Sequence, residues 1–279
     1  STQSTQQITK AMKMVSAAKL RRAQNAITQL RPYANKLRDI LENLSSSLEG
    51  NSGGQFAQVR PVEKVLIVAV TSNRGLAGAF NANIIRQVNR LIHDQYSAQA
   101  NAGNVKVLSI GKKASDFYSK NKTLYNGNHN EVYGDLRFDV VAPIAEKIMS
   151  LFAEGRFDKV ELVYNHFKNA ATQITTIEQF LPIEPVKGAV KVNTDYIFEP
   201  SKAEIVLQLI PKSLKTQLYK AIRDSFASEH GARMTAMHKA TDNATELRNQ
   251  LKLTYNKARQ AAITNEILEI VGGAEALKG

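Results

Sequence analysis

The fold follows from the end of the chain, where residues 211–279 read PKSLKTQLYKAIRDSFASEHGARMTAMHKATDNATELRNQLKLTYNKARQAAITNEILEIVGGAEALKG. The sixty residues after Pro211 contain no proline and only one glycine, Gly231. Most of the others are Ala, Leu, Lys, Arg, Glu, Gln and Met, the residues that are least costly to hold in a helix. We therefore predict one helix with Pro211 as its first residue and Gly272-Gly273 as its end. At about 1.5 Å per residue, it would be a rod roughly 90 Å long.

A helix of this length is a coiled-coil arm, a membrane span or part of a repeat, and its many charges exclude a membrane span. Small, apolar and hydroxyl side chains recur at a spacing of three and four and predict a seam. This seam consists of Met234, Met237, Thr241, Ala244, Leu251, Ala258 and Ala262. Small side chains let a partner helix approach closely but bury little apolar area. Two interpretations stay open, a weak intramolecular coiled coil or a rod whose outer face is also surrounded by protein.

Residues 1 to about 49 predict the partner helix. An unbroken heptad spacing of four and three joins Ala23, Ile27, Leu30, Ala34, Leu37, Leu41, Leu44 and Leu48. Upstream, the apolar stripe is expected to continue through Ile8, Met12, Val15 and Ala18. Pro32 should kink or loosen this helix, because proline removes one backbone hydrogen bond. Since the two arms stand at opposite ends of the chain, an antiparallel pair with a domain between them is expected.

The segment between the arms predicts an α/β domain. The run Lys64–Thr71 is continuously apolar, as in buried parallel strands. Further strands are expected at 105–110, 122–125, 159–164 and 173–181, the last as an edge or antiparallel strand. A helix that ends near Tyr96 is expected after the first strand and its turn, and two more helices are expected at 114–118 and 140–153. The predicted fold is α/β (α+β overall), an antiparallel coiled coil of the terminal helices with an inserted Rossmann-like domain. We expect the arms at 1–55 and 201–279, and the domain at 56–200.

The composition excludes several classes of protein. No cysteine is present, so disulfides, thiolate catalysis and cysteine metal sites are ruled out. No run of eighteen apolar residues is present either, so we expect no transmembrane helix. The net charge of +12 is concentrated in the arms, with eight Lys/Arg minus three acids (+5) in residues 1–50 and twelve minus eight (+4) in residues 201–279. This charge fits nucleic acid or an acidic protein partner, although no aromatic residue precedes Tyr33 to stack on bases.

The turn Ser72–Phe80 reads SNRGLAGAF and follows the first predicted strand, where Rossmann-type phosphate sites occur. It matches neither G-x-G-x-x-G nor a P-loop. We favour glycines that allow a tight turn and close helix packing, with a nucleotide site as the alternative. No catalytic constellation stands out at local spacing, and neither cofactor nor metal is expected.

Five stretches of the chain stand out together. They are Ile8–Val15 (ITKAMKMV), Ser72–Phe80, Ser228–Met234 (SEHGARM), Tyr255–Gln260 (YNKARQ) and Ile263–Ala276 (ITNEILEIVGGAEA). In this order they resemble the gamma subunit of F-type ATP synthases, and the resemblance covers essentially the whole chain.

The resemblance implies a rotating central stalk. The coiled coil would turn inside a hexamer of three alpha and three beta subunits, coupling ion flow through the membrane c ring to ATP synthesis or hydrolysis. It also implies a non-catalytic subunit that binds no nucleotide, metal or nucleic acid and whose foot stands on the c ring with an epsilon-type subunit. The location implied is peripheral, on an energy-transducing membrane, at the cytoplasmic side of a bacterial inner membrane, with the matrix side of a mitochondrial membrane as the less favoured alternative.

The resemblance also assigns roles to individual residues. In the C-terminal arm, contact with a beta subunit or coupling is assigned to Arg259, Gln260, Thr264, Glu266, Glu269 and Arg233. In the N-terminal arm, Met12 resembles the position that faces an acidic lever segment of beta, beside Lys10 and Lys13. Near the c ring, Tyr196, Phe198 and Glu199 resemble the foot motif, where Phe198 often appears as tyrosine in the family.

Overall fold

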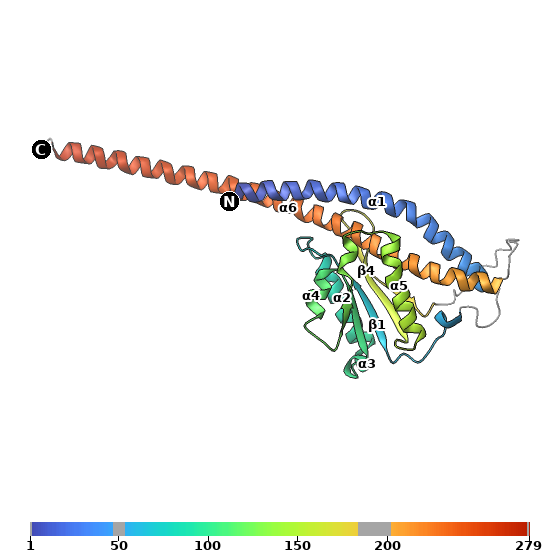
Figure 1. Ribbon diagram of the computed structural model, residues 1–279. Helices are drawn as coiled ribbons and strands as arrows, with labels where there is room; N and C mark the ends of the chain where they lie inside the picture. Colours follow the sequence, from blue (N-terminus) through green and yellow to red (C-terminus); the bar gives the residue numbers. More distant parts are fainter. Residues whose placement is uncertain (1, 47–53, 184–201, 278) are drawn as a thin grey trace.

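The computed structural model describes residues 2–46, 54–183, 202–277 and 279. These residues form a long two-helix rod with an α/β domain attached to one side (Figure 1). One of the two helices continues far beyond the end of the other. The expected boundaries at 55/56 and 200/201 stay predictions.

The rod is the antiparallel pair predicted from the sequence. Helix α1 spans Thr2–Ser46 and helix α6 spans Lys202–Ala276. Gln6 near the start of α1 donates to Thr245 of α6 at 2.6 Å, while Arg31 further along α1 reaches Asp224 at 3.2 Å. Residue numbers rise along one helix as they fall along the other, so the helices run in opposite directions.

The heptad seam of α1 faces α6 where its side chains are described. Ala23, Ile27 and Leu37 are buried, and Leu30 and Ala34 are partly buried. Leu41, Leu44 and Leu48 lie outside the side chains that the structure describes. The helix continues through Pro32 and curves along its length (Figure 1).

The predicted upstream stripe of α1 is wrong. Ile8 and Val15 are exposed, whereas the polar residues Thr9 and Ser16 are buried against α6. The reason is close packing of small side chains. The Thr9 hydroxyl accepts a hydrogen bond from Thr241 at 2.8 Å, and the hydroxyl of Ser16 donates to the carbonyl of Met12 at 2.7 Å.

The predicted ends of α6 are also wrong. The helix begins at Lys202 and carries Pro211 in its interior, because Ile210, Leu214 and their neighbours are buried in the core against the sheet and helix α5 (Phe138–Ala153). Tertiary packing of this kind outweighs the hydrogen bond that a proline removes. At the other end, Gly272 and Gly273 continue the helix to Ala276 and have no positive φ angle, so they form no left-handed cap.

The domain contains a five-stranded sheet in the order β3-β2-β1-β4-β5. Strand bounds are Val65–Val70 (β1), Val105–Ile110 (β2), Tyr125–Asn128 (β3), Lys159–Phe167 (β4) and Gln173–Leu181 (β5). The first four strands are parallel and β5 is an antiparallel edge strand, as predicted. Only β3 is displaced from its predicted place at 122–125. The Asn121 side chain accepts hydrogen bonds from the amides of Thr123 and Leu124 and holds those residues in a turn.

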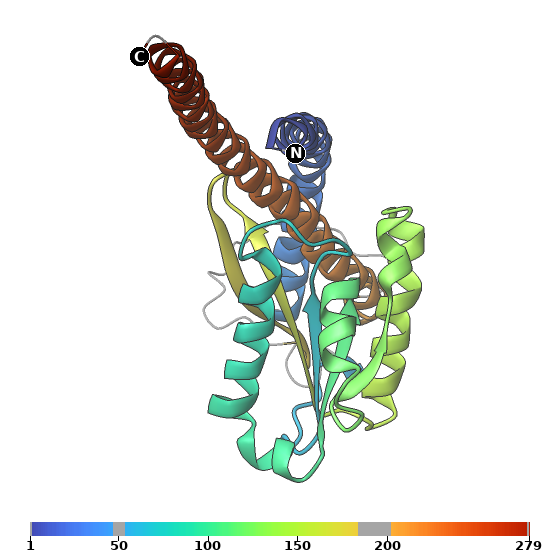
Figure 2. The same cartoon turned by 90° about the vertical axis from the view of Figure 1, so that its left-hand side faces the viewer.

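Alternate side chains of β1 build the two halves of the core. Leu66, Val68 and Val70 face α5 (Phe138–Ala153) and the first part of α6. Val65, Ile67 and Ala69 face α2 (Phe80–Gln95) and α4 (Lys112–Tyr118). The remaining elements are η1 (Gly54–Phe56), α3 (Ser97–Asn101) and η2 (Asn130–Tyr133). The sheet is therefore covered on both sides, and Figure 2 shows α6 crossing over one end of it.

A series of polar contacts joins α6 to the sheet. Gln217 donates to Glu178 of β5 at 2.8 Å, and Ser228 donates to the carbonyl of Asn165 in β4 at 3.0 Å. At Gly231 the approach is so close that a Cβ would lie 3.0 Å from the carbonyl oxygen of Ala170, in the β4–β5 turn. Because these contacts span about four turns of α6, the domain and the helix form one unit.

Gly111 should be the least replaceable glycine of the domain. Its φ is +108°, and a Cβ there would lie 2.1 Å from the carbonyl oxygen of Thr71. We expect Gly111→Ala to lower the free energy of unfolding by more than about 3 kcal/mol. The matched control is Gly78→Ala, at φ +59° with no atom within 4 Å, which should cost only about 1 kcal/mol. Equal losses in urea unfolding would contradict this account.

Candidate functional site

The largest surface without a neighbour in the chain is the end of α6, residues 249–276, which we call the lone arm. Gln6 of α1 still contacts Arg248, at 3.1 Å. Beyond that point every residue of the arm is exposed except Asn256, which is partly exposed. The arm extends roughly 40 Å at 1.5 Å per residue, and Figure 1 shows it projecting away from both α1 and the domain.

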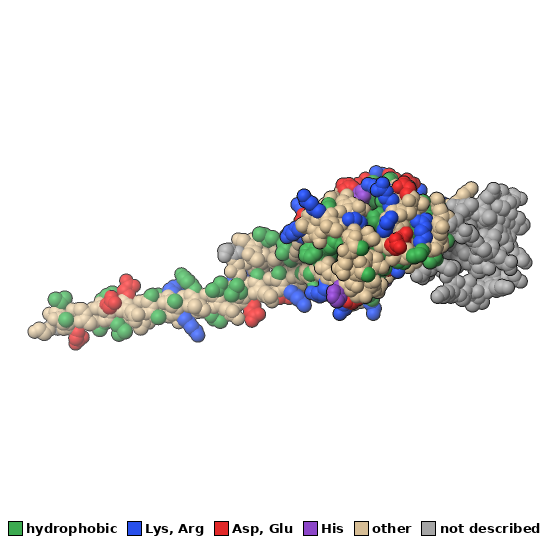
Figure 3. Space-filling view, turned by 90° about the horizontal axis from the view of Figure 1, so that it is seen from below, with side chains coloured by type: hydrophobic (Ala, Val, Ile, Leu, Met, Phe, Trp, Pro, Cys, Tyr) green, Lys and Arg blue, Asp and Glu red, His purple; other side chains and the backbone are tan. Residues whose placement is uncertain are grey.

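The lone arm carries apolar side chains around its whole circumference. Leu251, Ile263 and Leu268 are exposed by 52%, 48% and 63%, and at about 100° per residue they lie roughly a third of a turn apart. Figure 3 shows hydrophobic side chains along the arm, interspersed with basic and acidic ones. A helix that is apolar on every side is normally buried. The arm is therefore suited to enclosure by other protein, the second of the two interpretations left open by the sequence.

Five of the predicted contact residues lie on the lone arm and are exposed. They are Arg259, Gln260, Thr264, Glu266 and Glu269. The Thr264 hydroxyl donates to the carbonyl of Gln260 at 2.9 Å, so its side chain is turned toward the helix. Among the side chains that the structure describes, none of the three charged residues in this set has an intramolecular ion pair. Their charges are thus free for a partner.

The N-terminal contact residues lie in a second place, on α1 beside the paired part of α6. Lys10 is exposed, while Met12 and Lys13 are partly exposed. Ile8, Met14 and Val15 point outward at 56–60% exposure, so this side of α1 is also apolar. Contiguous exposed apolar side chains of this kind are typical of protein contact surfaces.

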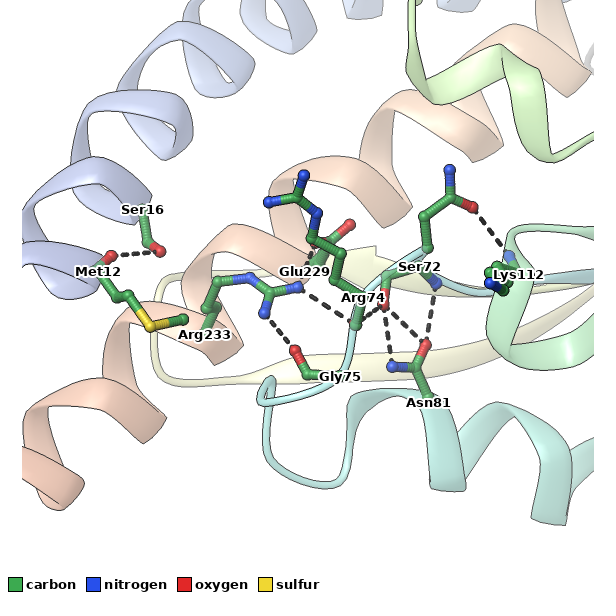
Figure 4. A network of polar contacts seen from close by, with 10 residues as sticks. Met12, Ser16, Ser72, Arg74, Gly75, Asn81, Lys112, Glu229 and Arg233 are labelled. Atoms are coloured by element: carbon green, nitrogen blue, oxygen red, sulfur yellow. Dashed lines mark hydrogen bonds and ion pairs between the residues drawn. The ribbon is translucent and has the colours of Figure 1, made fainter. Parts of the chain in front are cut away.

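Arg233, by contrast, is buried and is bonded within the chain (Figure 4). Its guanidinium donates to Glu229 at 2.6 Å, one helical turn away, and to the carbonyl oxygens of Arg74 and Gly75. Burial raises the pKa of Glu229, and the Arg233 charge opposes that shift. Arg233 therefore lies apart from the residues of the lone arm and fastens the Ser72–Phe80 turn to α6.

The Ser72–Phe80 turn is ordered by its own polar groups. The Ser72 hydroxyl donates to the carbonyl of Arg74 at 2.7 Å, and Asn81 accepts from the Ser72 amide at 2.9 Å (Figure 4). Leu76 has a φ of +63° and is 67% exposed at the tip of the turn. The carbonyl groups of Arg74 and Gly75 accept from Arg233. The φ of +59° at Gly78 fits the predicted tight turn, but a Cβ at Gly75 would approach no atom closer than 3.7 Å and one at Gly78 none within 4 Å, so the expected close packing at these glycines is wrong.

An aromatic cluster lies next to Arg233, with His230 buried and Phe226 and Tyr133 partly buried. The His230 ring packs edge-on against Phe226 at 4.5 Å between centroids, and Phe226 stacks on Tyr133 at 6.1 Å. Burial, together with the nearby charges of Lys19 and Arg233, lowers the pKa of His230 to about 4. Burial, together with the charge of Glu229, raises the pKa of Tyr133. The neutral form of His230 is therefore the one that fits the fold.

Several features of the site were beyond the sequence analysis, or lie outside the structure. The foot residues Tyr196, Phe198 and Glu199 lie outside the described residues. Two residues that fix α6, Asp224 and Glu229, were missed in the sequence, although a carboxylate at a helical seam position is an available signal.

Among the described residues, no group of three or more His, Asp or Glu side chains could hold a metal ion, and no helix is long and apolar enough to cross a membrane.

Comparison with known proteins gives consistent results along the chain. A family model described as "ATP synthase" matches residues 1–277. The ATP synthase gamma chain of Flavobacterium johnsoniae is 64% identical over all of this chain and 96% of its own length. The ATP synthase gamma chain of Chlorobaculum tepidum is 46% identical over 99% of this chain and 94% of its own length.

Solved structures resemble the fold. A chain in the central stalk and c ring of the Tetrahymena thermophila mitochondrial ATP synthase matches with a TM-score of 0.63 at 27% identity. The match covers 84% of this chain and 99% of that one. A chain in the rotor of the Euglena gracilis enzyme matches with a TM-score of 0.67 at 24% identity, over 94% and 95% of the two chains, and shares the fold.

His230 should make the stability of the chain depend on pH. Because its folded pKa of about 4 is below the ordinary 6.5, the folded state binds a proton less readily than the unfolded state. The stability due to the neutral ring is complete above pH 6.5 and is lost as the pH falls toward 4. The stability advantage of wild type over His230→Gln should therefore shrink by up to about 3 kcal/mol between pH 7 and pH 4. His93→Gln, at an exposed imidazole, is the matched control, and an equal change in both variants would refute the assignment.

Proposed function

This chain belongs to the ATP synthase gamma chain family, and from that premise we propose that the α1–α6 rod is the rotating shaft of such an enzyme. The observation that carries the proposal is the lone arm, a helix with apolar side chains on every side and no neighbour from its own chain. A force that acts on the attached α/β domain would be passed to the rod as torque.

The surface of the arm fits a part that turns inside other subunits. A rotor has to pass torque without binding tightly at one angle, because a strong contact becomes a barrier to the next step. The side chains of Arg259, Glu266 and Glu269 are exposed and unpaired within the described chain, so contacts through them are screened by salt and individually weak. Small side chains such as Ala261 and Ala262 lie between Arg259 and Glu266 and offer little for a partner to interlock with.

The partners that fit this arrangement are three alpha and three beta subunits around the rod, an epsilon-type subunit, and the membrane c ring at the foot. An acidic lever segment of beta would meet the exposed side of α1, where Lys10 and Lys13 flank Met12. Nucleotide chemistry then takes place on the other subunits, and this chain is non-catalytic. We place it at the membrane only through the complex, on the cytoplasmic side of a bacterial inner membrane.

Assembly is the direct test of this function. The full chain is mixed with alpha and beta subunits of a close relative, and the product is purified and assayed for ATPase activity. We expect a complex with one copy of this chain per three alpha and three beta subunits, active only when the chain is present. A well-folded chain that neither joins the complex nor changes its activity would exclude the shaft.

Arg259→Ala should weaken coupling more than folding. Because Arg259 is exposed and has no intramolecular ion pair, we expect its loss to change the free energy of unfolding by less than about 0.5 kcal/mol. In the assembled enzyme, ATP-driven torque and ion pumping should both fall. Lys239→Ala removes an exposed cation from the paired part of α6 and is the matched control. Normal torque and synthesis in Arg259→Ala would remove this residue from the contact surface.

A further inference from the structure

A fully buried carboxylate joins the two helices of the rod to the sheet. Asp224 of α6 is 0% exposed. One of its oxygens accepts from the guanidinium of Arg31 on α1 at 3.2 Å, and the other lies 3.0 Å from Nδ1 of His166 on β4. We call this group of three side chains the Asp224 bridge. It connects three elements that are far apart in the sequence.

Arg31 makes the bridge stronger by holding two elements at once. The same guanidinium nitrogen that meets Asp224 also donates to the carbonyl of Phe167, the last residue of β4, at 3.1 Å. One arginine of α1 is thereby attached to both α6 and the sheet. Hydrogen bonds that involve charged groups are shorter and stronger than neutral ones.

Most of the remaining contacts between α1 and α6 near Arg31 are apolar, although Lys19 of α1 lies close enough to Glu229 and His230 of α6 to act on their charges. Near Arg31 the seam consists of apolar side chains, among them Ala23, Ile27 and Ala227. Such smooth packing is non-directional and has no polar group to fix an angle. Other polar contacts between the helices lie at the beginning of α1, where Gln6 and Thr9 meet α6. Thr9 and Arg31 are 22 residues apart, about 33 Å along the helix.

Among the side chains that the structure describes, no second ion pair joins α1 to α6. Asp224 is also held from the side of the domain through His166 and cannot follow α1 freely. We propose that Asp224 is a positioning residue that fixes the angle of α1 about α6, so that torque on the domain reaches both helices together. This inference rests on the proposed shaft function and goes beyond the contact residues named above.

The first experiment tests the bridge in the isolated full chain and does not depend on rotation. Arg31→Met, Asp224→Asn and the double variant form a thermodynamic cycle in urea unfolding. We expect the two changes to be coupled by at least about tenfold in the unfolding equilibrium constant, as for a hydrogen bond to a charged group. Amide hydrogens of residues 20–37 in α1 should exchange faster in both single variants. Additive changes with unaltered exchange in α1 would overturn the inference.

The second experiment measures coupling in the complete complex, reconstituted into vesicles. With Asp224→Asn and Arg31→Met, ATP hydrolysis should continue while fewer ions are pumped per ATP, and the loss should grow as the opposing gradient rises. Arg31→Lys retains the charge and should restore part of the coupling. Ile84→Val removes one methyl group from the core between α2 and the sheet and lowers stability without touching the Asp224 bridge. It is the control for lost stability alone.

The two experiments separate the possible failures. If Asp224→Asn pumps as well as Ile84→Val at the same loss of stability, the bridge serves folding only and the inference is wrong. If Asp224→Asn does not fold, the comparison of Arg31→Met with Arg31→Lys decides instead, since only Arg31→Lys keeps a positive charge beside the buried Asp224 carboxylate. If the wild-type complex does not pump, the shaft function fails, while the cycle in the isolated chain still reports whether α1 is fixed by the bridge.

Discussion

The burial of the middle of α6 between α1 and the sheet is the constraint on which the molecule depends. There the helix presents apolar residues such as Leu218 and Ile222 to the core, while small residues such as Ala227 face α1. No isolated helix of this composition could hold a fixed direction over 75 residues. Because α1 and the sheet hold the middle of α6 on two sides, the domain sets the direction of the lone arm, although it does not contact the arm.

Polar contacts give this clamp its angular precision. Apolar packing sets how closely α6 approaches its neighbours, but it tolerates small rotations. The hydrogen bonds of Gln217, Asp224, Ser228 and Arg233 each fix one azimuth of α6 relative to the domain. A shaft of the gamma chain family needs both properties, a rigid connection at its base and a smooth surface where it meets other subunits.

The sequence predicts the architecture better than the details of the seam. Period and length were sufficient for the antiparallel arms and for β1, since a six-residue apolar run has few other fates. Hydropathy failed at Thr9 and Ser16, because close packing of small polar side chains replaced burial of Ile8 and Val15. Contacts between distant segments, such as Arg31 with Asp224, leave no periodic pattern. The accessible contact residues came from resemblance, and periodicity alone could not have indicated them.

The length difference between the two helices has a consequence for how the protein is made. A single helix in water, without a neighbour, is only marginally stable. Its amide hydrogens exchange readily with solvent, and its backbone is accessible to proteases. Enclosure by other subunits would therefore stabilise the helix from Leu251 to Ala276, at an entropic cost subtracted from the binding free energy. Unassembled copies would therefore expose an apolar surface that enclosure covers, and such a surface favours aggregation.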